Sequence, residues 1–170
     1  MNSIIKELIL KINILRLYLY ALRGIKRTLP AYKVLGVVLH HEGGSNGFER
    51  VNLWHKKKWG FESSLGYYIG YNRYVDSDGT IHIARLDGEQ AAHTVVAGKP
   101  YYYNRHYIGI CFQGNNSPTT IQFNKVKAQL DLLRAQYPGL DIKAHSELHA
   151  TICPGDKIRE WLKEYKKGLK

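Results

Sequence analysis

Apolar residues recur at steps of three and four along three stretches of the chain, the spacing that places them on one face of a helix. The first stretch, residues 4–23, carries lysines and arginines on its other faces. The second begins at Ser117-Pro118, where the serine can cap a helix and the proline can occupy its first turn. The third covers residues 155–167. The three apolar faces consist of Ile5, Leu8, Ile12, Leu15, Leu19 and Leu22; of Phe123, Val126, Leu130, Leu133 and Tyr137; and of Ile158, Trp161, Leu162 and Tyr165.

Runs of β-branched and aromatic residues between these stretches predict the strands of a sheet. The run at residues 35–39 is short and apolar, and it delivers His40 and His41 at its end. A tight turn at Asp78-Gly79 is expected to join two further strands into a hairpin. A short helix over residues 52–59 is expected to turn Trp54 inward and its lysines outward. The remaining predicted strands cover residues 66–74, 80–84, 107–112 and 142–144.

Strands that alternate with helices indicate an α/β fold, here a single domain with a central mixed β-sheet flanked by helices. A chain of 170 residues with 44% hydrophobic residues is the size of one domain with an ordinary core. We expect that domain to cover residues 34–170. The basic amphipathic helix then belongs to an N-terminal extension over residues 1–33, with Leu29-Pro30 near its end.

Lysine and arginine outnumber aspartate and glutamate by 25 to 14, which gives a net charge of +11. Such a charge attracts polyanions, among them nucleic acids, anionic lipids and the acidic polymers of bacterial envelopes. The basic extension is either an ordinary packing helix with a solvated side or a cationic arm that lies on a membrane or an anionic polymer. No motif for reading a nucleic-acid sequence is visible, so we expect no specific nucleic-acid partner.

The N-terminal segment does not predict a membrane span, because charged residues interrupt its apolar face. It also lacks the small-residue cleavage site of a signal peptide. We therefore expect synthesis in the cytoplasm and release by another route if the protein acts outside. The two cysteines, Cys111 and Cys153, are too few for a disulfide framework and are expected to be free thiols.

Metal-binding side chains gather in residues 143–155, which run from a predicted strand into a Pro-Gly turn. His145 and Cys153 offer a nitrogen and a sulfur to a borderline-soft ion such as zinc. A catalytic zinc needs a third protein ligand and an open position, and His40 at the end of its strand is a candidate. Two alternatives stay open: a structural thiol beside a surface histidine, and a helical pair of His145 and His149 at i, i+4.

Several short motifs occur in an order and at a spacing that resemble one enzyme family. They are Val38-Leu39-His40-His41, Gly70-Tyr71 ahead of Asp78-Gly79-Thr80, Ala92-His93, Asn104 ahead of Ile108-Gly109-Ile110, Ala144-His145-Ser146-Glu147, and Thr151-Ile152-Cys153-Pro154-Gly155. Over residues 34–167 the chain resembles zinc-dependent N-acetylmuramoyl-L-alanine amidases. These form a superfamily of type-2 amidases and peptidoglycan-recognition proteins, and the resemblance is close to the amidases of phage endolysins.

The resemblance implies a role for each matching residue. The implied assignments are binding of one Zn2+ by His40, His145 and Cys153, catalysis by Tyr71 and Thr151, substrate contact by His93 and Asn104, and orientation of a zinc-bound histidine by the carboxylate of Glu147. His41 competes with His40, and Tyr67 and Tyr68 compete with Tyr71. The family commonly has threonine two residues after the first ligand, where this chain has Glu42.

Ordinary structural roles compete with several of these assignments. Tyr71 is one of many tyrosines in the chain, His93 can be a structural imidazole, Asn104 can cap a loop, and Glu147 can form a surface ion pair. The other histidines named by the sequence, His55, His106 and His149, are expected to be surface groups without a special role.

The function that the resemblance implies is hydrolysis of peptidoglycan at the amide between N-acetylmuramic acid and the L-alanine of the stem peptide. We expect a monomeric endolysin that acts on the bacterial cell wall after release, with the basic extension reaching anionic envelope polymers or the outer membrane. Two other classes stay open. One is a catalytically silent peptidoglycan-binding module, which usually lacks a ligand such as the cysteine. The other is a basic protein that binds a nucleic acid or a polymerase.

Overall fold

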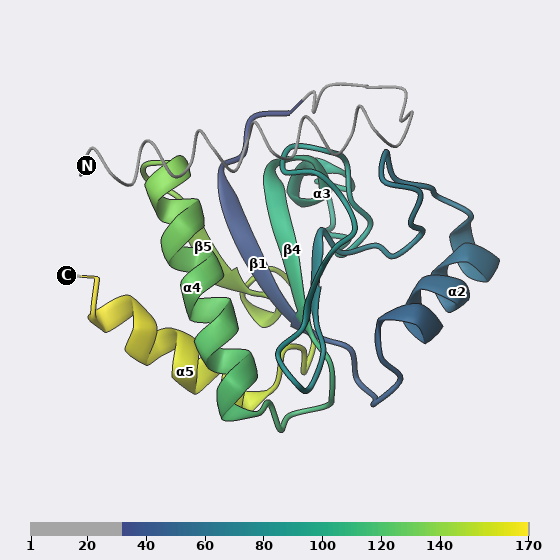
Figure 1. Ribbon diagram of the computed structural model, residues 1–170. Helices are drawn as coiled ribbons and strands as arrows, with labels where there is room; N and C mark the ends of the chain where they lie inside the picture. Colours follow the sequence, from purple (N-terminus) through teal and green to yellow (C-terminus); the bar gives the residue numbers. More distant parts are fainter. Residues whose placement is uncertain (1–31, 170) are drawn as a thin grey trace.

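A mixed five-stranded sheet with helices on both faces makes up the computed structural model, which describes residues 32–169 (Figure 1). In spatial order β3-β2-β4-β1-β5, β1 pairs in parallel with both β4 and β5, and β2 pairs in parallel with β4. The edge strand β3 runs antiparallel to β2. The strands are β1 (Gly36–His41), β2 (Arg73–Val75), β3 (Ile81–Ile83), β4 (Tyr107–Phe112) and β5 (Asp141–Ala144). The predicted α/β domain with a central mixed sheet is confirmed.

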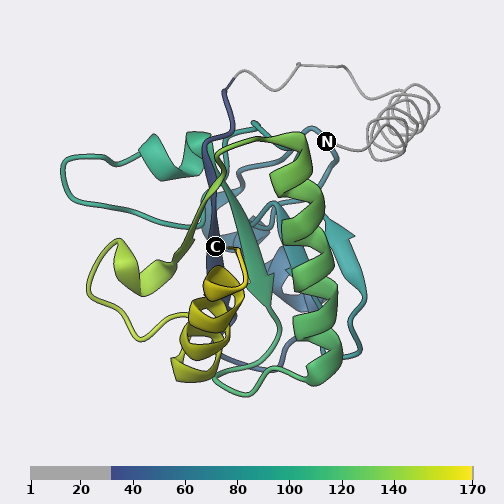
Figure 2. The same ribbon diagram turned by 90° about the vertical axis from the view of Figure 1, so that its left-hand side faces the viewer.

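Helices α4 and α5 cover one face of this sheet, and α2 lies against the other (Figures 1 and 2). The short helix α3 immediately precedes β4, and the single 3-10 turn η1 immediately follows β5. The bounds are α2 (Phe48–Trp59), α3 (Tyr102–His106), α4 (Thr120–Gln136), η1 (His145–Glu147) and α5 (Asp156–Lys167).

Alternation along the two central strands divides their side chains between the two faces. On β1, Val37 and Leu39 pack into the core beneath α4 and α5. His40, the next residue after Leu39, faces the other side of the sheet. On β4, Ile110 points into the same core, whereas Cys111 joins the cluster on the α2 face. The core beneath α4 and α5 is therefore mainly apolar, and His40 lies on the opposite face of the sheet.

Most predicted elements are present. The strands expected at 35–39, 107–112 and 142–144 correspond to β1, β4 and β5, and the turn at Asp78-Gly79 joins β2 to β3. The two C-terminal helices lie where their apolar stripes predicted. Both cysteines are free thiols, as expected. The predicted helix at residues 4–23 lies outside the described residues. Within residues 32–169, no helix combines the length and hydrophobicity needed to cross a bilayer.

The prediction that Trp54 faces inward is wrong. Helix α2 begins at Phe48, four residues before the expected start, and its buried side chains are Phe48, Val51 and His55. Trp54 is 55% exposed and lies under the ammonium of Lys58. His55, expected at the surface, is only 3% exposed. Positions 48, 51 and 55 are three and four residues apart and form the inward face of α2, so a histidine occupies its last position.

The expected strand at residues 66–74 is also shorter than predicted, because only Arg73–Val75 joins the sheet. The backbone N–H groups of the residues just before Tyr71 donate to side chains of α2 instead of to a neighbouring strand. A backbone whose donors are already satisfied does not need a ladder partner.

The N-cap of helix α4 is Thr119 and not Ser117, the residue predicted from the sequence. The Thr119 hydroxyl accepts from the Gln122 backbone N–H at 3.2 Å, and the Gln122 side chain accepts from the Thr119 N–H at 2.8 Å. This reciprocal arrangement is a capping box.

We expect Thr119→Ala to lower the free energy of unfolding by about 1 kcal/mol, since a lost N-cap leaves orphan N–H groups at the helix start. The measurement is the urea midpoint of the full chain. Ser117→Ala is the matched control and should leave the midpoint unchanged; an equal loss in both variants would contradict the assignment of the cap.

Candidate metal centre and active site

Two parallel neighbours bring the candidate metal ligands to one edge of the sheet. His40 lies near the carboxyl end of β1, and His145 directly follows β5, whose last residue Ala144 pairs with Leu39. Cys153 follows in the loop that leads to α5. One donor atom from each of His40, His145 and Cys153 lies within 4.8 Å of the others. Residues far apart in the sequence thus form one compact group.

A relay of hydrogen bonds fixes the tautomer of His40. The carbonyl of Tyr107 can only accept, so His93 Nε2, 3.0 Å away, carries the proton. His93 Nδ1 is then an acceptor, and it receives a hydrogen bond from His40 Nε2 at 3.0 Å. His40 Nδ1 is left with its lone pair, 3.7 Å from the Cys153 sulfur. This nitrogen is in the form that a metal requires.

His145 shows the same division between its two nitrogens. Its Nε2 lies 2.7 Å from the Thr94 hydroxyl and 2.8 Å from His149 Nε2. Its Nδ1 is buried and has no hydrogen-bond partner among the described residues. An orphaned buried nitrogen is unfavourable in a protein interior unless another ligand uses it.

The consecutive residues His93 and Thr94 therefore hydrogen-bond to the imidazoles of His40 and His145, and the side chain of Asn104 holds both residues in place. The Asn104 side chain accepts from the backbone N–H groups of His93 and Thr94 and donates to the Thr94 carbonyl at 2.6 Å. Gly109 makes room for this arrangement, because a Cβ there would lie 2.6 Å from His93 Cδ2. Asn104 thus supports the site through its side chain, which keeps one N–H without a partner among residues 32–169, and it also lines a cavity; its expected substrate contact stays a prediction.

The charge states of these groups suit a cation. Burial, followed by the neighbouring imidazoles of His93 and His145, holds the pKa of His40 well below its usual value. Burial lowers the pKa of His145 to about 3 and raises that of Cys153 to about 11. The imidazoles are thus neutral ligands, and the thiol must release its proton when a metal binds. The His41 backbone N–H donates to the Cys153 sulfur at 3.4 Å, which favours the thiolate.

Two imidazole nitrogens and one sulfur fit zinc, which takes nitrogen at about 2.0 Å and sulfur at about 2.3 Å in a tetrahedral arrangement. Three protein ligands also leave a fourth position for water or substrate. His41 is outside this group, and its own Nδ1 is buried without a hydrogen-bond partner in the part of the chain that the structure describes. His145 and His149 do not lie on an α-helix, because residues 145–147 make a 3-10 turn; the two Nε2 atoms nevertheless lie 2.8 Å apart.

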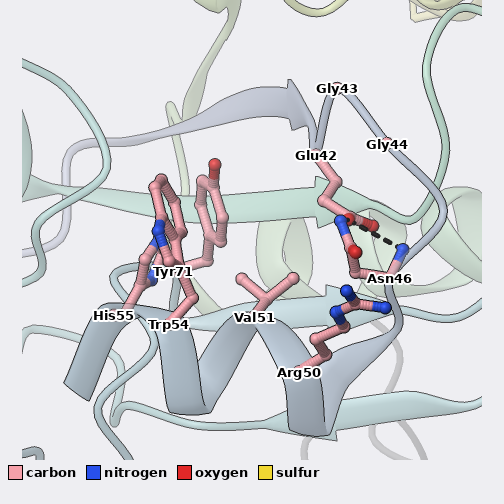
Figure 3. Close-up of a pocket in the computed structure, with 9 residues that line it drawn as sticks. All are labelled: Glu42, Gly43, Gly44, Asn46, Arg50, Val51, Trp54, His55 and Tyr71. Atoms are coloured by element: carbon pink, nitrogen blue, oxygen red, sulfur yellow. Dashed lines mark hydrogen bonds between the residues drawn. The ribbon is translucent and has the colours of Figure 1, made fainter. Parts of the chain in front are cut away.

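Tyr71 lies beside this group and lines a cavity of about 370 Å³ (Figure 3). Its ring centroid is 5.2 Å from that of His40. In Figure 3 the side chains of Arg50, Trp54 and His55 rise from α2 toward Tyr71 and Glu42. Burial, followed by the nearby Cys111 thiol, raises the pKa of Tyr71 well above its ordinary value. The hydroxyl is therefore protonated and can donate a hydrogen bond.

A second cavity, of about 630 Å³, is lined by His145 of the ligand group. Its polar groups include His93, His145 and His149, and its apolar groups include exposed aromatic rings. This cavity therefore reaches one member of the ligand group, His145.

The remaining predicted residues act on the backbone around the ligands. The Thr151 hydroxyl accepts from the Cys153 N–H at 3.2 Å, so it shapes the turn that carries the sulfur. The Glu147 carboxylate accepts from the Ala144 N–H at 2.6 Å and lies 3.6 Å from the Lys166 ammonium. Glu147 therefore fixes the turn that bears His145, and its carboxylate accepts no hydrogen bond from an imidazole among residues 32–169.

Glu42, the residue that departs from the expected threonine, is fully engaged. One carboxylate oxygen accepts from the backbone N–H of Asn46, and the other accepts from the Tyr74 hydroxyl. The carboxylate thus closes the loop after β1 and borders the cavity that Tyr71 lines.

A model of one protein family matches residues 30–156 of this chain, and its description is N-acetylmuramoyl-L-alanine amidase. The chain belongs to the N-acetylmuramoyl-L-alanine amidase family. The resemblance inferred from the short motifs is confirmed by this match.

Relatives of this amidase-family chain include phage and animal proteins. The endolysin of Escherichia phage T7 is 26% identical over 123 residues, which cover 68% of this chain and 74% of that protein. Peptidoglycan-recognition protein SC1a/b of Drosophila simulans is 29% identical over 159 residues, 82% of this chain and 80% of that protein. The structure of N-acetylmuramoyl-L-alanine amidase LysC from Clostridium intestinale is similar with a TM-score of 0.68 at 25% identity, covering 85% of this chain and 91% of that one.

Two contributors to the site were missed by sequence reasoning. Thr94 follows His93 directly, and the His-Thr pair was a signal that could have identified it. His55 lies at the inward position of α2, and only the correct phase of that helix reveals its burial.

We expect Thr94→Val to weaken zinc binding by about tenfold to a hundredfold, because a lost partner of a metal-binding imidazole typically has that effect. Competition with a chromophoric chelator measures the affinity. Thr120→Val, the same change in the first turn of α4, is the control and should bind zinc as the unaltered protein does. Equal affinities in all three proteins would contradict the role of Thr94.

Proposed function

We propose that the protein is a zinc-dependent N-acetylmuramoyl-L-alanine amidase that degrades peptidoglycan, in the manner of a phage endolysin. The observation that carries the proposal is the group of His40, His145 and Cys153. One nitrogen of each imidazole is held by a neighbour, whereas His40 Nδ1 faces the Cys153 sulfur and His145 Nδ1 has no partner among the described residues. Membership of the amidase family supports the same substrate. One Zn2+ is the proposed cofactor.

The proposed reaction breaks the C–N bond between the lactyl carbonyl of N-acetylmuramic acid and the amino group of L-alanine. Water supplies a hydroxyl to the carbonyl carbon and a proton to the departing amine, which leaves a carboxylic acid and a free stem peptide. Zinc, when bound, supplies Lewis acidity and lowers the pKa of water to near neutrality.

The chain's own residues orient the reactants and the developing charge. Tyr71, which is protonated and whose ring lies beside that of His40, would donate a hydrogen bond to the carbonyl oxygen as it becomes negative. Thr151 holds the turn of Cys153 and offers a second hydroxyl, although a neutral threonine supplies no positive charge. His93 acts through His40 by fixing its tautomer.

Peptidoglycan is the proposed partner, and the chain is proposed to act as a monomer on the bacterial cell wall after synthesis in a host cytoplasm. The boundary between a basic extension at residues 1–33 and the catalytic domain at residues 34–170 remains part of this proposal. The extension would bring the enzyme to anionic envelope polymers or the outer membrane through its lysines and arginines.

A second candidate is a peptidoglycan-binding module without activity, which the similarity to a peptidoglycan-recognition protein favours. The complete set of three donors favours the enzyme. Binding of purified cell walls without release of peptide would support the binding module.

We expect the zinc-loaded protein to release stem peptides with a free N-terminal alanine from purified peptidoglycan, as identified by mass spectrometry. Removing zinc with a chelator should abolish release, and adding zinc should restore it. Cys153→Ser should lose zinc and activity together, because a hydroxyl is a much poorer zinc ligand than a thiolate. Cys111→Ser is the control for loss of a thiol and should keep its zinc. Release of sugar fragments, or unchanged release by Cys153→Ser, would overturn the proposal.

We expect Tyr71→Phe to lower kcat by about a hundredfold or more, the usual effect of losing one donor to a developing oxyanion. Bound zinc, measured by elemental analysis, should not change, since Tyr71 is not one of the three donors. Tyr67→Phe, a neighbouring tyrosine that competed for this role, is the control. A similar loss in both variants would show that the hydroxyl of Tyr71 has no special role.

A further inference from the structure

The segment that carries Tyr71 is held in an unusual way. Three consecutive backbone N–H groups before it all donate to side chains of α2. The amides of Tyr68 and Ile69 donate to Asn52 Oδ1 at 2.7 and 3.0 Å. The amide of Gly70 donates to His55 Nδ1 at 2.9 Å. Two side chains of one helix thus replace the neighbouring strand that the sequence pattern predicted.

Asn52 and His55 are three residues apart, so they lie on the same side of α2. The backbone amide can only donate, which makes His55 Nδ1 an acceptor and places the proton of the neutral ring on Nε2. Burial lowers the pKa of His55 to about 4. The ring therefore keeps this acceptor throughout the neutral pH range, and its contact with Trp59, at 4.3 Å between centroids, limits its rotation.

The opposite side of the same segment is held equally closely. The Ala92 N–H donates to the Gly70 carbonyl at 2.9 Å, and Arg85 Nε donates to the Ile69 carbonyl at 2.8 Å. A Cβ at residue 70 would lie 2.3 Å from the Ala92 carbonyl oxygen, so only glycine fits here. Backbone N–H and carbonyl groups of residues 68–70 are therefore both held by hydrogen bonds, and these bonds also fix the backbone direction at Tyr71.

We propose that Asn52 and His55 form a clamp that sets the position of the Tyr71 hydroxyl, and that both are positioning residues for the amidase reaction. This inference rests on the proposed function. It assigns catalytic importance to a helix that contributes no metal ligand. Because a shift of one residue in extended backbone turns each side chain to the opposite side, small changes in this segment would remove Tyr71 from the ligand group.

A double-mutant cycle tests the clamp through kcat. His55→Leu removes the acceptor, and we expect kcat to fall about tenfold to a hundredfold with little change in KM and none in zinc content. His55→Asn offers an amide oxygen near the position of Nδ1 and should restore most of the activity. Asn52→Ala should cause a loss of the same kind. In a Tyr71→Phe background, His55→Leu should have no further effect on kcat, since its action passes through the missing hydroxyl.

Gln122→Leu is the matched control for the loss of a buried polar side chain. Gln122 is 1% exposed, and its Nε2 donates to the carbonyls of Val75 and Gln113 beneath α4. We expect this variant to be less stable in urea and to retain kcat. If His55→Leu lowers kcat just as much in the Tyr71→Phe background, the clamp is overturned, and a general effect of His55 on folding explains the loss.

A spectroscopic measurement separates this inference from the proposed function. With 3-fluorotyrosine at position 71, the zinc-loaded protein and His55→Asn should each show one sharp fluorine resonance, and His55→Leu and Asn52→Ala should show broadened or multiple resonances. A protein that cleaves no peptidoglycan but shows these spectra would refute the amidase and support the clamp. Active protein with unchanged kcat and an unchanged spectrum in both variants would refute the clamp alone.

Discussion

The parallel pairing of β1 with its neighbours β4 and β5 is the constraint on which the site depends. Parallel strands end at the same edge of a sheet, and ligand sites form there because loops from several strands meet. The register that sets Leu39 against Ala144 brings His40 and His145 together. The register of β1 on β4 sets His40 beside Cys111, on the face away from α4 and α5. A slip of one residue would bury His40 in the apolar core, so the core residues of β1 specify the site as well as the fold.

Polar side chains around this edge of the sheet mostly hydrogen-bond to backbone, and these bonds fix the segments that carry the candidate ligands and their partners. Asn104 holds His93 and Thr94, which hold the two imidazoles. Glu147 and Thr151 fix the turns before and after the loop between His145 and Cys153. The arrangement of donors is therefore set by hydrogen bonds of the protein itself. Such support is what allows a catalytic metal to keep an open position, because the ligands need not be gathered by the ion.

The central strands and C-terminal helices could be predicted because their signals are local: β-branched runs for β1 and β4, and a regular apolar stripe for α4. The ligand group could be found because motif resemblance links residues that no periodicity connects. Helix α2 and the segment before Tyr71 could not be predicted, since their contacts join side chains to backbone. A hydrophobic pattern favours Trp54 as the inward residue of α2, whereas the structure uses His55. Residue type alone also does not predict the backbone partners of Asn104 and Glu147, because an amide or carboxylate can bond to backbone as readily as to substrate or imidazole.

The electrostatics of the ligand group tie metal binding to proton release. The imidazoles of His40 and His145 are neutral because burial and mutual repulsion oppose their protonation. The Cys153 thiol is also neutral near pH 7, since burial opposes the thiolate. A bound divalent cation would favour the Cys153 thiolate, because it stabilises an adjacent anion. It would also keep the imidazoles of His40 and His145 neutral, because it takes the position of a proton on nitrogen. With Zn2+ held by His40, His145 and Cys153, a thiolate would reduce the net charge of the centre to +1. A centre of that charge would still polarise a carbonyl oxygen, and the ring of Tyr71 lies beside His40 on the same face of the sheet.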